Sequence, residues 1–468
     1  MNKLPWDSSS LRYDQEKKDR CDELRSKLPD RICPMPFTTL IVNPDGRVGF
    51  CRERTNNDVV GNIKEQSLFE IWNGEKMRSI RREFLEGKIK TCASQIRDRR
   101  CFEQCFNQVI LPYTDFSEYQ KNPPLRLSPD FNGQCNLQCV TCDIWTLPNG
   151  LYDEIGFWEM AEEKVFPHLK MLDPLAGEPF IQKDFFRLID LMHEKNPDCA
   201  WRFTTNAHWK FEGKIRAALD KVKNIYGFII SVDAATPETY HKVRYPGNLH
   251  LVWETIDQII AYREERIQKY GPSQKFGITV AMALHSENWH EAPMFMRWAH
   301  SKGIEPGLQG VYFPEKISVF KIPEESKRRE ILDFFIREMD YRDLIHIFRI
   351  TTPLMVSLGG ELEKEYKQKI IDAYFNKELR SIDLWECGES FPRFFETFAP
   401  HEQRAMAIRI LDYSLEKLSY EHFKRGHVFF KKLISSLSSE EQKDYQHKLL
   451  QFAKKNVPEL FLASLSKN

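Results

Sequence analysis

Cysteines are concentrated at the front of this chain, and their spacing constrains its fold more than any other feature. Nine of the eleven cysteines lie between Cys21 and Cys142. Clustered thiols in a chain of this kind are more typical of metal ligands than of a disulfide framework, because reducing compartments keep thiols free. We therefore expect the region up to Cys142 to fold around metal sites.

Composition places the chain with globular proteins of several domains. Its 468 residues predict two or three domains. The 68 basic and 68 acidic residues balance, so no overall field attracts nucleic acid, and we do not expect nucleic acid as a partner. The N-terminus lacks the apolar core of a signal peptide, and no run of about 18 apolar residues occurs. These features predict a cytoplasmic protein without membrane contact.

The cysteine-rich region is expected to form a small domain over residues 30–111, after an N-terminal extension of residues 1–29. Thr39–Val42 and Arg47–Cys51 read as two strands joined by a turn that contains Gly46. Apolar spacing over Ser67–Glu86 predicts one or two amphipathic helices. A proline-rich linker, residues 112–124, follows.

From residue 125 short apolar strands alternate with helices, which is typical of βα units and a parallel sheet. Six strands are expected: Leu125–Ser128, Met171–Leu175, Ala200–Thr204, Gly227–Ser231, Gly277–Leu284 and Gly307–Tyr312. They predict an α/β fold, a partial (β/α)6 TIM-like barrel over residues 125–321. Residues 322–468 are charged and helical in pattern, and we find no repeat of fixed period in the chain.

The most specific motif is Cys135-x3-Cys139-x2-Cys142, directly after the first predicted strand of this barrel. Three thiolates on one loop can bind one face of a cubane iron-sulfur cluster, whereas an electron-transfer cluster normally has all four irons ligated. One iron would remain open to a small molecule. A zinc site is the alternative, since C-x2-C pairs also occur as zinc half-sites.

This array resembles that of the radical S-adenosylmethionine (SAM) superfamily. The resemblance implies a [4Fe-4S] cluster whose open iron is chelated by the amino and carboxylate groups of SAM. Ala176-Gly177-Glu178-Pro179 resembles the family's Gly-Gly-Glu-Pro motif, with Ala176 in place of the first glycine. In the family, backbone and carboxylate groups of this motif contact the amino group of SAM.

Further positions match in the family's order. Asn206 resembles the asparagine of a Thr-Asn-Gly motif, with Ala207 in the glycine place, and is implied to bind the ribose hydroxyls. Ser231 is implied to contact the ribose region, and Arg244 to pair with the SAM carboxylate, which suits its planar fork. Asn288 follows the fifth strand at a position where relatives often carry asparagine.

A second cysteine set resembles a SPASM or twitch domain, which binds auxiliary clusters. Cys33 is followed by twelve residues, Gly46, four residues and Cys51. Cys92, Cys101 and Cys105 fit the rest of the pattern, except that Gln95 replaces one cysteine. We expect a single auxiliary [4Fe-4S] cluster bound by Cys33, Cys51, Cys92 and Cys105, with Cys101 and Cys21 as substitutes. Relatives usually carry this module after the barrel, and an uncharacterised subgroup carries it before.

The resemblance implies reductive cleavage of SAM to a 5′-deoxyadenosyl radical, which abstracts hydrogen from a substrate. Peptide modification is favoured over a small-molecule substrate, and a reductant such as flavodoxin or ferredoxin would supply the electron. The cofactors carry this chemistry, while the protein orients the reactants. The competing hypothesis is a non-catalytic iron-sulfur or zinc protein for electron transfer or as a scaffold, which would not bind SAM.

Overall fold

The computed structural model describes residues 32–51, 59–90, 110–340, 347–376, 398–417 and 433–456, with isolated positions at 23–24, 27–29, 343–344, 395–396 and 430. The chain forms two compact units, residues 1–283 with 297–307 and residues 284–296 with 308–468. No helix in the described ranges has both the length and the apolar character needed to cross a lipid bilayer.

The first unit is built on one nine-stranded sheet of order β11-β10-β8-β7-β6-β4-β1-β2-β3. Its strands are β1 (Thr39–Val42), β2 (Arg47–Gly49), β3 (Gly61–Asn62), β4 (Arg126–Pro129), β6 (Met171–Leu172), β7 (Ala200–Thr205), β8 (Asn224–Ser231), β10 (Gly277–Leu284) and β11 (Glu305–Gly310). All six predicted barrel strands are present and lie in sequence order. The pairs β4–β6, β6–β7, β7–β8 and β8–β10 are parallel, so the predicted α/β class is confirmed.

The predicted hairpin is also present, but it does not form a sheet of its own. β1 pairs antiparallel with β2, and Gly46 lies in the turn with φ +89°. On its other side β1 pairs in parallel with β4, with Thr39 opposite Arg126. All four residues of β1 are buried, as is typical of a strand covered on both faces. The cysteine-rich segment therefore continues the sheet of the predicted barrel.

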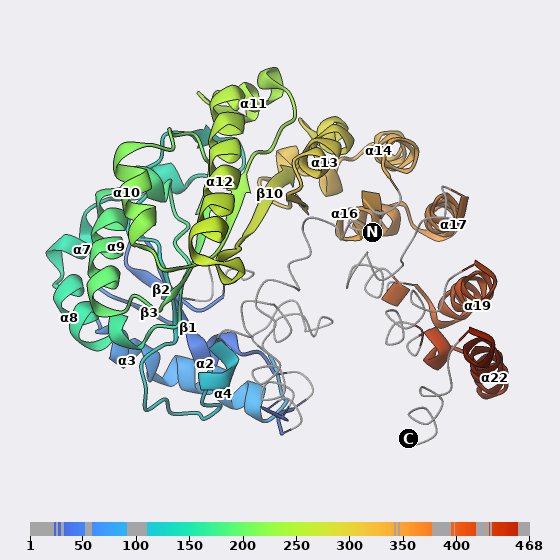
Figure 1. The fold of residues 1–468 in the computed structure, drawn as a ribbon, viewed down its shortest axis with the longest axis horizontal. Helices are drawn as coiled ribbons and strands as arrows, with labels where there is room; N and C mark the ends of the chain where they lie inside the picture. The colour runs from blue at the N-terminus through green and yellow to red at the C-terminus, as the bar shows by residue number, and fades with distance from the viewer. Residues whose placement is uncertain are drawn as a thin grey trace. The chain divides into compact units, whose positions relative to one another are not determined.

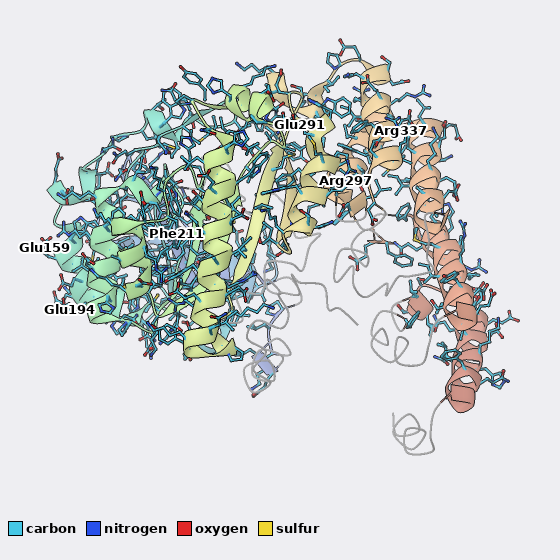
Figure 2. All side chains as sticks on the ribbon, turned by 45° about the horizontal axis from the view of Figure 1, so that its top comes forward. Glu159, Glu194, Phe211, Glu291, Arg297 and Arg337 are labelled. Carbon is cyan, nitrogen blue, oxygen red and sulfur yellow. The ribbon has the colours of Figure 1, made fainter. Side chains whose placement is uncertain are left out.

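Helices cover the outer side of this sheet, and Figure 1 shows α8, α9, α10 and α12 following one another there. The helices of the first unit include α2 (Met35–Thr38), α3 (Leu68–Trp72), α4 (Glu75–Leu85), α7 (Leu151–Glu154), α8 (Phe157–Lys164), α9 (Lys183–Lys195), α10 (Gly213–Lys221), α11 (Pro237–Val243) and α12 (Leu249–Tyr270); α13 (Ala292–Ser301) spans the boundary between the units. Glu159 on α8 and Glu194 on α9 point outward in Figure 2, whereas Phe185 and Leu188 on α9 are buried. This division matches the amphipathic spacing.

The described part of residues 322–468 is helical, as predicted, and contains α14 (Glu325–Glu338), α16 (Phe348–Leu358), α17 (Gly360–Asn376), α19 (Pro400–Lys417) and α22 (Ser439–Asn456), all in the second unit. Two of its helix pairs are joined by the same kind of tyrosine–aspartate hydrogen bond. The Tyr366 hydroxyl of α17 donates to Asp333 of α14 at 2.9 Å, and the Tyr445 hydroxyl of α22 donates to Asp412 of α19 at 2.6 Å. In both pairs a lysine three residues after the tyrosine lies over its ring.

These matching positions show that the sequence does contain a repeat. Asp333 and Asp412 are 79 residues apart, and so are Tyr366 and Tyr445. The segments EKEYKQKII and QKDYQHKLL around the two tyrosines align without a gap. The expectation of no fixed period was wrong for this region, because two copies with few identical residues give a weak signal until a shared contact identifies the register.

Candidate active site

One cavity of about 330 Å³ lies in the first unit, where the loops after β4, β6, β7 and β8 meet. The carboxyl ends of parallel strands are where active sites of such sheets assemble. Seven of the predicted site residues line this cavity: Cys135, Cys139, Cys142, Gly177, Asn206, Ser231 and Arg244. Residues separated by more than a hundred positions in the sequence therefore share one site.

The three cysteines belong to the loop after β4. Cys139 lies in the short strand β5 (Gln138–Cys139), which pairs antiparallel with β9 (Arg244–Tyr245), so that Cys139 stands opposite Arg244. All three thiols are free. Burial raises the pKa of Cys135 to about 11 and also raises the pKa of Cys139. These thiols stay protonated at neutral pH unless a metal compensates the charge of the thiolate.

The donor set fits a cluster better than it fits a single ion. Among the described residues, no group of three or more His, Cys, Asp or Glu side chains is placed to hold one metal ion. A cubane distributes its thiolates over different irons, whereas a structural zinc ion takes four ligands at one centre. Three cysteines line the cavity wall, the number that a cluster with one open iron would need.

A buried hydroxyl beside these thiols also fits an added group. Tyr240 on α11 is fully buried, and its hydroxyl has no hydrogen-bond partner in the described structure. Burial raises the pKa of Tyr240, Arg244 lowers it and Cys139 raises it, so the three groups lie close enough to interact. A buried donor without an acceptor is costly, which favours an acceptor that arrives with a bound group.

The loop of Ala176 and Gly177 packs directly against the cysteine loop. Gly177 has φ +62°, and a Cβ built on it would lie 2.2 Å from the carbonyl oxygen of Gln134. The Glu178 N–H donates to the same oxygen at 2.9 Å, and the Gln182 side chain donates to it at 3.0 Å. Only glycine fits this close approach, whereas Ala176 is not among the described residues with positive φ.

The Glu178 carboxylate, expected to contact a ligand, is turned into the protein. Glu178 is fully buried and is not part of the cavity wall. Its carboxylate accepts hydrogen bonds from the Asn206 N–H at 2.6 Å, the Thr205 hydroxyl at 2.7 Å, the Trp209 indole at 3.2 Å and the Phe180 N–H at 3.2 Å. Burial raises its pKa to about 7, although these bonds lower it. The carboxylate thus orders the ends of two strand loops.

Asn206 lines the cavity at the end of β7. Its Nδ2 donates to Asn136 Oδ1 at 2.8 Å and lies 3.8 Å from the Cys135 sulfur. The next residue, Ala207, is fully buried and has φ +52°. This left-handed conformation favours glycine and is strained for alanine. Ala207 therefore adopts the backbone conformation expected of the glycine that it replaces in the motif.

The sequence analysis missed Asp233, which lies two residues after Ser231 at the end of β8. Asp233 is buried, has φ +60°, and accepts a hydrogen bond from Arg244 Nε at 2.8 Å. Its other oxygen accepts from the N–H of Ala283 at 2.6 Å. The available signal was the position itself, since a residue that follows a strand of a parallel sheet lies at the edge where the site forms.

Other predicted residues lie elsewhere. Pro179 is buried at the start of a short 3-10 helix. Asn288 belongs to the second unit, where its Oδ1 accepts from the His285 N–H at 2.8 Å. Cys33, which precedes α2, is buried, and Cys51, which follows β2, is half-buried. The remaining candidates lie outside the described residues: Cys21, Cys92, Cys101 and Cys105.

Comparison with known proteins gives matches over both regions. Residues 33–105 match the model of the SPASM iron-sulfur cluster-binding domain. The chain is 22% identical over 282 residues to the GTP 3′,8-cyclase of Nautilia profundicola, an alignment that covers 56% of this chain and 79% of that protein. It thus spans most of that relative.

Solved structures of Streptococcus suis SuiB also match, but remotely. One has 15% identity and a TM-score of 0.29, with 66% of this chain and 68% of that chain covered. The structure of SuiB bound to its precursor peptide SuiA has 13% identity and a TM-score of 0.30, over 66% and 68% of the two chains. Scores of this size do not establish a common fold.

Proposed function

We propose that this chain, a radical SAM enzyme of the SPASM type, cleaves SAM reductively at a [4Fe-4S] cluster held by Cys135, Cys139 and Cys142. The observation that carries this proposal is the shared cavity, in which the three thiols stand beside Gly177, Asn206, Ser231 and Arg244. An electron carrier would have no use for a cavity of about 330 Å³ next to an incompletely ligated cluster.

The residues around the cavity divide the work of holding SAM. The backbone of Gly177 would contact the amino group of SAM, and the guanidinium of Arg244 would pair with the SAM carboxylate. Asn206 and Ser231 would bind the ribose. Glu178 would not contact SAM itself. Its carboxylate holds the loops that carry Gly177 and Asn206. When bound, the cluster supplies the electron that cleaves SAM to the 5′-deoxyadenosyl radical, which then abstracts hydrogen from the substrate.

The auxiliary cluster is assigned to the cysteine-rich segment. The SPASM match begins at Cys33 and ends at Cys105, which supports these two as ligands together with Cys51 and Cys92, with Cys101 as the substitute. Because the segment between Cys33 and Cys51 contains β1, which pairs with β4 of the main sheet, this cluster would be anchored to the same unit as the SAM site.

Two substrate classes follow from the family. A ribosomally made peptide is the favoured substrate of this chain, as the resemblance to SPASM and twitch enzymes implies. The similarity to a GTP 3′,8-cyclase keeps a nucleotide as the second candidate. A flavodoxin or ferredoxin would be the reductant.

The test is anaerobic reconstitution with iron and sulfide, followed by reduction with SAM and chromatography for 5′-deoxyadenosine. Wild type should form 5′-deoxyadenosine, and Cys139→Ala should form none. Cys199→Ala is the matched control, because Cys199 is also a buried free thiol but lies outside the cavity wall. If fully loaded wild type neither binds SAM nor forms 5′-deoxyadenosine, the electron-transfer or scaffold hypothesis replaces this one.

A further inference from the structure

The position of Arg244 is fixed from several directions. Its N–H caps α11 by donating to the carbonyl of Tyr240, and its carbonyl accepts from the Gly247 N–H at 2.7 Å. The strand β9 that begins with Arg244 pairs with β5, which carries Cys139. The backbone of Arg244 is therefore joined to the cysteine loop, and only the side chain remains to be oriented.

The side chain is oriented by Asp233. Arg244 Nε lies 2.8 Å from Asp233 Oδ2, and the two side chains are only 9% and 4% exposed. No other hydrogen bond of the guanidinium is found within the described residues. The terminal Nη1 and Nη2 atoms can therefore form the two parallel bonds to a carboxylate that make arginine suited to this task.

We propose that Asp233 is a positioning residue that holds Arg244 with its terminal nitrogens presented to the carboxylate of SAM. This inference rests on the proposed function. A buried guanidinium is costly without an anionic partner, and Asp233 supplies that partner before the ligand arrives. Because Asp233 binds Nε, the Nη1 and Nη2 atoms of the guanidinium are left for the ligand.

The backbone at Asp233 shows why this residue type is required. Its φ of +60° lies in the left-handed region, which aspartate and asparagine tolerate better than most residues. Its Oδ1 accepts from the Ala283 N–H of β10 at 2.6 Å, so the side chain joins the ends of two neighbouring strands. The substitution Asp233→Asn would keep this backbone conformation and this acceptor but remove the negative charge beside Arg244.

Asp233→Asn is therefore the test variant, with Asp220→Asn as the matched control. Asp220 also bonds an arginine Nε, that of Arg216, but on the exposed surface of α10. Affinities of the anaerobically reconstituted proteins are measured for S-adenosylhomocysteine, which has the amino-acid carboxylate, and for 5′-methylthioadenosine, which lacks it. Iron content and circular dichroism are recorded for each protein.

We expect Asp233→Asn to weaken S-adenosylhomocysteine binding on the order of tenfold and to leave 5′-methylthioadenosine binding unchanged, as Asp220→Asn leaves both. Arg244→Gln should show the same selectivity, and adding Asp233→Asn to it should cause little further loss. If Asp233→Asn weakens both ligands equally, or neither, the positioning role is refuted. If Arg244→Gln itself does not distinguish the ligands, the assignment of Arg244 to the carboxylate fails instead.

Discussion

Replacing Gly177 by alanine should separate the cysteine loop from the loop of Ala176 and Gly177. The added Cβ would lie 2.2 Å from the Gln134 carbonyl oxygen, where an ordinary contact is at least 3.4 Å. One of the two loops has to move by about 1 Å, since the obstacle is backbone and cannot rotate away. That movement also breaks the hydrogen bond from the Glu178 N–H to the same oxygen.

The magnitude follows from two contributions. The left-handed backbone at φ +62° costs an alanine about 1 kcal/mol. The steric overlap with the lost hydrogen bond adds about 2 kcal/mol. Gly156→Ala isolates the first contribution, because Gly156 has φ +65° and no atom lies within 4 Å of a Cβ built on it. SAM binding would require the two loops in their original arrangement, so Gly177→Ala should pay the overlap energy of about 2 kcal/mol on binding, or about 30-fold in affinity. Gly156 lies outside the cavity wall, so its substitution should cost stability but not affinity.

The assay is SAM affinity and iron content after anaerobic reconstitution. Gly177→Ala should bind SAM about 30-fold more weakly than Gly156→Ala, which should remain close to wild type. Circular dichroism checks that both variants are folded. If folded Gly177→Ala binds SAM like wild type, or if Gly156→Ala is equally impaired, close packing of these loops is not what shapes the site.

Three other outcomes follow from the structure. Ala207→Gly should raise the thermal midpoint by relieving about 0.5 kcal/mol net, and an unchanged or lower midpoint would contradict the strain at φ +52°. Burial raises the pKa of Glu178 from 4.5 to about 7, so the folded state binds more protons than the unfolded chain in that window. Stability should fall as the pH rises from about 4.5 to 7, and Glu178→Gln should flatten this slope in thermal midpoints. Tyr366→Phe and Tyr445→Phe should each lower the free energy of unfolding of the second unit by about 1 kcal/mol in urea titrations. A loss at only one tyrosine would contradict their equivalence in the repeat.

Much of this molecule follows from local pattern. Strand alternation and helical spacing located the six sheet strands, because burial on one or both faces requires apolar residues at a fixed period. Gly277–Leu284 was predicted with the bounds that the structure has. The spacing of Cys135, Cys139 and Cys142 predicted a cluster-binding loop, since ligands of one cluster on one loop have to be close in sequence.

Contacts between distant segments were decided by the tertiary structure. Nothing in Thr39–Val42 indicates that this strand pairs with β4, because an apolar strand can pair with any open edge. The carboxylate of Glu178 could face a ligand or the protein, and the donors of Thr205, Asn206 and Trp209 direct it inward. The role of Asp233 likewise depends on an arginine eleven residues away.

The sequence by itself therefore determined the α/β class, the three closely spaced cysteines on the loop after β4 and the order of the motifs, because each depends on neighbouring residues. Only the tertiary structure decided which side chains line the cavity and which hydrogen-bond to the lining residues without reaching the cavity. The physical reason is that a hydrogen bond or ion pair depends on distances of about 3 Å between atoms that the chain brings together only when the sheet has formed.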